Sequence, residues 1–107
     1  MSIRVKLEHK DGKVVLDQHV FNTLKSARRY AYNVLTALPN IKAVRISKSS
    51  SVYNPDWSNP SYVVHGSHGI YYLTHGVGNG RYVNADGTLA DREIEDDVPI
   101  MKMELDL

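Results

Sequence analysis

The sequence contains no cysteine, which excludes disulfide bonds, cysteine-ligated zinc and cysteine-based catalysis. It also lacks any run of about 20 apolar residues, so no membrane-spanning helix is predicted. The N-terminus alternates charged and apolar residues, unlike the continuous apolar segment of a signal peptide. Burial alone must therefore stabilise the fold, and we expect a cytoplasmic protein that does not bind membranes.

At 107 residues, the chain has room for one hydrophobic core, and we expect a single domain over residues 1–107. Hydrophobic residues make up 42% and charged residues 23%, which is ordinary for a globular protein. Length and composition therefore leave both binding and enzymatic functions open.

The first part of the chain reads as a hairpin, a helix and a strand. Alternation over residues 3–8 predicts a strand, and an Asp-Gly turn followed by apolar residues completes a hairpin over 2–21. Apolar residues three and four positions apart then line one side of a helix over 24–38. Asn22 or Thr23 can cap its start, and Pro39 stops it. A further strand follows, over residues 41–46.

The second half reads as strands and turns, at residues 62–65, 70–73, 81–84 and 101–107. The predicted fold class is therefore α+β. A single amphipathic helix packs on a mostly antiparallel sheet, in the order ββαβ followed by β-hairpins and a C-terminal strand.

Three histidines lie close together in the sequence. A two-residue turn at Gly66-Ser67 would place His65 directly opposite His68, whereas His75 would point to the other face. Two imidazoles do not complete a metal site, so we expect neither a metal nor a cofactor. Metal binding by the pair His65 and His68 is kept as the alternative.

Two segments are candidate contacts for a partner. The loop over residues 49–60 is long for a compact domain and contains Tyr53 and the only tryptophan, Trp57. Because an exposed tryptophan is a common interface anchor, we expect this loop to bind another protein. The acidic run over residues 91–97 is predicted to be a solvated loop and a second contact.

Charge is distributed unevenly between the two halves. Residues 1–50 carry a net charge of +7 and residues 51–107 a net charge of −6. The halves can neutralise each other within one domain, or head to tail in a homo-oligomer. Alternatively, Lys25, Arg28 and Arg29 on the predicted helix form a basic surface for nucleic acid.

One motif resembles a nuclease family. The segment Gly69-Ile70-Tyr71, followed after ten residues by Tyr82-Val83-Asn84, resembles the paired strand motifs of GIY-YIG nucleases, and Arg92 falls where that family has its catalytic arginine. The resemblance implies that Tyr71 and Tyr82 position phosphate or water, and that Arg92 stabilises phosphate charge. It also implies a helix at Arg92, where an Asp-Gly turn interrupts the segment.

The sequence shows neither a Ser-His-Asp order with a nucleophile elbow nor a helical His-Glu-x-x-His motif. We therefore predict a small non-enzymatic binding or protein-interaction module. Nucleic-acid binding through the basic N-terminal half is the alternative, and a degenerate GIY-YIG-like nuclease is the third hypothesis.

Overall fold

A computed structural model describes residues 2–49, 62–66, 70–74 and 80–93 of the chain. The helices and strands, in chain order, are β1 (Ser2–His9), β2 (Val14–Phe21), α1 (Leu24–Ala37), β3 (Ile41–Ser49), β4 (Tyr62–His65), β5 (Tyr71–Thr74), β6 (Arg81–Val83) and β7 (Leu89–Glu93).

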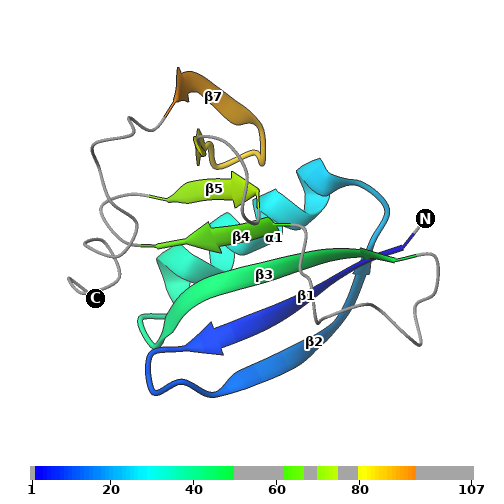
Figure 1. The fold of residues 1–107 in the computed structure, drawn as a ribbon, viewed down its shortest axis with the longest axis vertical. Coiled ribbons are helices and arrows are strands. Elements are labelled where there is room, and N and C mark those ends of the chain that lie inside the picture. The colour runs from blue at the N-terminus through cyan, green and yellow to red at the C-terminus, as the bar shows by residue number, and fades with distance from the viewer. Residues whose placement is uncertain (1, 50–61, 67–69, 75–79, 94–107) are drawn as a thin grey trace.

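The seven strands form one antiparallel sheet in the order β2-β1-β3-β4-β5-β6-β7. Because β1 is antiparallel to both neighbours, β2 and β3 run in the same direction on either side of it, and α1 connects them. Figure 1 shows α1 lying across one face of the sheet. The predicted α+β fold is confirmed, while the predicted strand over 101–107 lies outside the described residues.

Both ends of α1 follow from local chemistry. Thr23 is the N-cap, and its hydroxyl accepts a hydrogen bond from the backbone N–H of Ser26 (3.1 Å), which satisfies a helix N–H that has no partner within the helix. At the other end Leu38 is extended (φ −114°, ψ 103°), as expected for the residue before a proline. The predicted helix and its end before Pro39 are therefore confirmed.

The core lies between α1 and the sheet. Ala27 and Ala31 are fully buried, and these small side chains let the helix approach the strands closely. The inner strand β3 contributes Val44 and Ile46, and β1 contributes Val5, all with no exposed surface. The remaining core residues are Ile3, Val34, Ile41, Val64, Tyr72 and Val83.

The predicted two-residue turn between β4 and β5 is wrong. His65 pairs with Tyr71, not with His68, so the connection spans residues 66–70. The reason is that the N–H of Gly66 donates to the carbonyl of Lys42 (3.2 Å), which continues the pairing with β3 past the end of β4. The observed register therefore differs from the predicted register by three positions. Because this shift is an odd number, it changes which side chains of β4 and β5 share a face of the sheet.

Two further boundaries differ from the prediction. Residues 91–93, the start of the predicted acidic loop, belong to β7, because β7 continues the hairpin that the Asp86-Gly87 turn begins. Residue Ser49, the predicted start of the long loop, ends β3, because β3 pairs with β1 up to Ser2.

Candidate binding site at the β2 bulge

The most elaborate polar site in the described residues lies where β2 departs from regular pairing with β1. Residues 17–19 of β2 all lie opposite one β1 residue, Val5. Such a bulge bends a strand and changes the direction in which its side chains point. The flanking register pairs are Arg4–Val20 and Lys6–Leu16.

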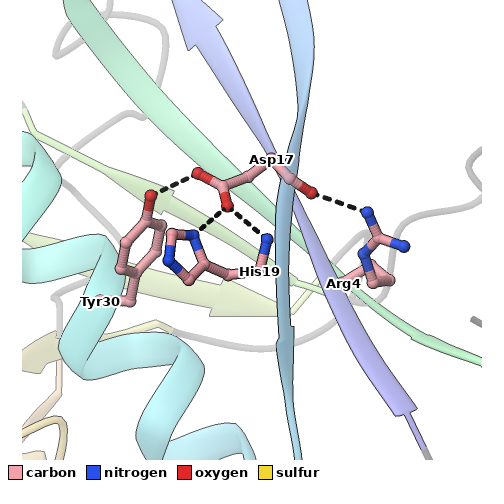
Figure 2. A network of polar contacts seen from close by, with 4 residues as sticks. All are labelled: Arg4, Asp17, His19 and Tyr30. Carbon is pink, nitrogen blue, oxygen red and sulfur yellow. Dashed lines mark hydrogen bonds and ion pairs between the residues drawn. The ribbon is translucent and has the colours of Figure 1, made fainter.

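Asp17 is the centre of the polar contacts at this bulge, as Figure 2 shows. One carboxylate oxygen accepts the backbone N–H of His19 (2.8 Å) and lies 2.7 Å from Nδ1 of the His19 ring. The other accepts the hydroxyl of Tyr30, from α1. The backbone carbonyl of Asp17 accepts a hydrogen bond from Nη2 of Arg4 (2.8 Å), a residue of β1 that is buried. Contacts from three elements therefore hold the bulge.

The same contacts shift two pKa values in opposite directions. Partial burial would raise the pKa of Asp17, but hydrogen bonds from Tyr30 and His19 outweigh it, and the net effect lowers this pKa. Burial, the hydrogen bond to Asp17 and the charge of Asp17 raise the pKa of Tyr30 to about 12. Near neutral pH the carboxylate is therefore ionised and the phenol neutral, the pairing that the hydrogen bond requires.

An aromatic group is built on this bulge. The ring centroids of His19 and Tyr30 are 5.2 Å apart, as are those of Phe21 and Tyr30. His19 and Phe21 are stacked at 6.3 Å, with 28° between their planes. The His19 side chain is 68% exposed, whereas that of Asp17 is only 10% exposed. The bulge therefore presents a ring to solvent while the carboxylate that orients it is covered.

A hollow of about 260 Å³ adjoins this aromatic group, between β2 and the outer side of α1. Arg29 and Asn33, both exposed, provide a guanidinium and an amide at its wall. The remaining lining residues are Phe21, Ser26 and Tyr30. Flat rings, neutral hydrogen-bonding groups and one cation together suit the recognition of a ligand.

The three predicted basic residues have different surroundings. Arg29 lines the hollow, and Lys25 is exposed one helical turn earlier. Arg28 instead donates from Nε to the carbonyl of Gly87 (2.8 Å), and its Cζ lies 5.1 Å from the centroid of the Tyr72 ring. Its head group therefore holds the β6–β7 turn, and only Lys25 and Arg29 remain candidates for a ligand.

The other predicted site residues are mostly outside the description. Tyr53, Trp57, His68 and His75 fall outside the described residues, so the loop and the histidine pair stay predictions. His65 is buried and faces Tyr71 across the β4–β5 pair. Within ranges 2–49, 62–66, 70–74 and 80–93, no group of three or more His, Asp or Glu residues could hold a metal ion.

The residues of the GIY-YIG resemblance are partly brought together. Tyr71 on β5 pairs directly with Tyr82 on β6, and their ring centroids are 4.7 Å apart. Arg92, however, lies on strand β7 and not on the helix that the resemblance implies. The Asp86-Gly87 turn explains this difference, because it reverses the chain into a strand directly before Arg92.

The second notable surface is the other side of β2. Val14, Leu16 and Val20 pair with alternate residues of β1 that point away from α1, so they form an apolar row on that face. Among the described residues, the exposed large apolar side chains are these three together with Val15 and Leu38. Four of the five therefore lie on one strand at the edge of the described sheet.

Comparison of the chain with protein-family models, curated proteins and solved structures finds no match. In the part of the chain that the structure describes, no helix is long and apolar enough to cross a membrane. The candidate surfaces therefore have to be judged by their own geometry.

Sequence reasoning missed the centre of the site, Asp17, His19, Phe21 and Tyr30. A signal was present, because the polar triplet at residues 17–19 interrupts the apolar residues of β2 on both sides. An interruption of this kind is typical of a bulge, and bulges often lie beside functional sites.

Proposed function

We propose that this chain is a non-enzymatic module that binds another protein through the outer side of β2. The observation that carries the proposal is the apolar row of Val14, Leu16 and Val20 on an edge strand, each residue 43–45% exposed. Single exposed apolar residues are common, whereas Val14 and Leu16 lie two positions apart on one face of β2 and Val20 lies on the same face beyond the bulge. Exposed apolar residues grouped on one face are typical of an interaction surface.

The edge itself supports a protein partner. Natural edge strands are commonly protected by charges, prolines or bulges, yet residues 14–16 contain none of these before the bulge begins at Asp17. A short extended segment can therefore pair with this stretch, while its apolar side chains pack on the row. Because the bulge at 17–19 bends the strand, side-chain packing rather than a long backbone ladder provides most of the contact.

The test compares two substitutions of exposed leucines in a pull-down from cell extract. We expect Leu16→Lys to lose bound protein, because a charge in the row costs desolvation on binding. The control is Leu38→Lys, which places the same charge at the 47% exposed residue after α1. Equal capture by the wild type and Leu16→Lys, with both folded by circular dichroism, would refute the proposal.

A second candidate function is nucleic-acid binding, favoured by Lys25 and Arg29. These cations lie four residues apart on the exposed side of α1, where residues at this spacing are neighbours, and Arg29 adjoins the aromatic group at the bulge. This candidate predicts that the captured material disappears after nuclease treatment of the extract. It also predicts binding to labelled oligonucleotides that weakens with salt.

A further inference from the structure

Resting on the second candidate function, we infer that the hollow between β2 and α1 is a subsite for one unpaired base of a single-stranded nucleic acid. The base packs on Phe21 and Tyr30, which line the hollow, beside the exposed His19 ring that contacts both of them. Arg29 contacts the adjoining phosphate. The inference follows from the size of the hollow, the order of its rings and the position of its cations.

The hollow is small and open, which suits one group of a larger ligand. Its volume of about 260 Å³ is below the roughly 300–1,000 Å³ that is typical of pockets for whole small molecules. The hollow is also open to solvent along the outer side of α1, where Ser26, Arg29 and Asn33 are all exposed. It therefore suits one group of a longer ligand that continues over the surface.

The rings provide a stacking platform that is already ordered. His19, Phe21 and Tyr30 contact one another at centroid distances of 5.2–6.3 Å, and Asp17 fixes the imidazole through Nδ1. A base that packs on Phe21 and Tyr30, with the exposed His19 ring beside it, extends this group without first having to order it. This order lowers the entropy cost of binding. Stacking of this kind is how proteins hold unpaired bases with little sequence preference.

The cations are placed for the backbone of such a strand. Arg29 reaches the hollow itself, and Lys25 lies one turn away towards the start of α1. The carboxylate at the bulge, Asp17, is covered and already accepts hydrogen bonds from Tyr30 and His19, while Lys25 also lies near the exposed Asp86. Ser26 and Asn33 add a hydroxyl and an amide that can bond to base edges. A duplex hides its base faces in the stack, so a single strand is the better ligand.

The experiment measures fluorescence anisotropy of labelled oligothymidine and oligoadenosine single strands, and of the duplex that they form, over a series of salt concentrations. We expect the single strands to bind more tightly than the duplex. His19→Ala should weaken single-strand binding roughly 5- to 150-fold, the range expected for the loss of one stacking contact with a base. Arg29→Ala should weaken binding to both sequences alike and lower the slope of log affinity against log salt by about one.

Two exposed residues provide matched controls. Lys13→Ala removes the same charge as Arg29→Ala, but from the β1–β2 turn at the far end of β2. Gln18→Ala shortens an exposed bulge residue next to His19. Neither should change affinity by more than about twofold, and thermal unfolding of all four variants checks that each is folded.

The outcomes separate the subsite from the function on which it rests. Absence of oligonucleotide binding at low salt would overturn both. Binding that His19→Ala and Arg29→Ala leave unchanged would overturn the subsite alone, and so would equal losses for Arg29→Ala and Lys13→Ala, which indicate diffuse attraction. Loss of a captured protein on His19→Ala would assign the hollow to a protein ligand and also overturn the inference.

Discussion

At the scale of single residues, Asp17 has the most consequential environment. It is a covered carboxylate in a strand, where an unpartnered charge would be costly, and it is tolerated because His19 and Tyr30 both bond to it. Since its pKa is lowered in the folded state, Asp17 stabilises the fold above its unfolded-state pKa. That stabilisation is lost as the pH falls through the folded-state pKa.

The partner of Asp17 gives a prediction at the opposite end of the pH scale. The pKa of Tyr30 is raised to about 12 from its ordinary value of 10.0, so the folded state retains this proton where the unfolded state has lost it. Its stabilisation is complete below pH 10 and falls between pH 10 and 12. We expect Tyr30→Phe to reduce the free energy of unfolding by roughly 1–3 kcal/mol near neutral pH.

Urea unfolding of both proteins at several pH values measures this effect. The difference between wild type and Tyr30→Phe should narrow as the pH rises from 10 to 12. The comparison removes the contribution of other tyrosines, including Tyr72, whose pKa is also raised by burial. A difference that stays constant across this window would show that Tyr30 does not titrate as its contacts require.

At the scale of elements, the β6–β7 turn is attached to α1 by a close backbone approach. Gly87 has a positive φ of 91°, its carbonyl accepts Nε of Arg28, and a methyl group on it would overlap the backbone carbonyl of Lys25. The turn is internally ordered as well, because the N–H of Thr88 donates to the Asp86 carboxylate (3.0 Å). The turn therefore acts as a clamp that connects the last strands to the helix.

A comparison of Gly12 with Gly87 separates two contributions to the loss of stability on substitution, steric overlap and an unfavourable backbone conformation. Gly12 has a similar φ of 94°, but a methyl group at its Cα would have no neighbour within 4 Å. Gly12→Ala should therefore cost only the roughly 1–2 kcal/mol of a left-handed alanine. Gly87→Ala should cost a further 1–3 kcal/mol or so, because overpacking is added. Chemical denaturation measures both, and equal losses would contradict the clamp.

The elements that sequence could predict are those decided by local patterns. The helix shows apolar residues at helical spacing up to Leu38, and Pro39 ends it by its own geometry. The β4–β5 register could not be predicted in this way. Gly66-Ser67 satisfies the local preference for a tight turn, but the hydrogen bond that decides the register joins Gly66 to Lys42, which is distant in the sequence.

The site was less predictable than the fold for the same reason. Arg4 and Tyr30 reach Asp17 from β1 and α1, and no spacing within β2 reveals that they converge. Arg28 and Arg29 are adjacent and chemically alike, yet Arg28 donates a hydrogen bond to Gly87 whereas Arg29 lines the hollow. Helical spacing places Arg28 nearer than Arg29 to the buried face, but the hydrogen bond to Gly87 follows from the position of the β6–β7 turn.

At the scale of the whole molecule, the described residues form one helix that packs on one side of a seven-stranded sheet. α1 contacts β1, β2, β3, β4 and β6, so its small buried face is shared among strands from both halves of the chain. The uneven charge of the two halves is only partly compensated between them in the described residues. Glu8 pairs with Arg45 (3.1 Å) and Lys42 (3.7 Å) of its own half. Between the halves, Lys25 lies near Asp86. The pKa of Asp86 is lowered mainly by hydrogen bonds from Thr88 and to a smaller extent by the charge of Lys25.

The position of β3 inside the sheet, between β1 and β4, predicts where the described fold is most sensitive to substitution. Ile46 has no exposed surface and packs in the core, so Ile46→Ala should reduce the free energy of unfolding by about 2–5 kcal/mol. This loss is a large part of the total free energy of unfolding of a domain, which is typically about 5–15 kcal/mol. Val20→Ala, at a residue 45% exposed, should change it by less than about 1 kcal/mol. Comparable losses in urea unfolding would contradict this placement of the core.

The position of β1 between β2 and β3 also sets the order in which the chain can fold. The β1–β2 hairpin joins residues close in sequence, whereas β1 pairs with β3 through contacts such as Lys6 with Arg45, which require a loop of about 40 residues to close. Local pairings form quickly and distant ones slowly. We therefore expect the β1–β2 hairpin to form before β1 pairs with β3. Until that pairing forms, the edge of β1 that faces β3 has no strand partner, and closure of the segment that contains α1 is expected to limit the rate of folding.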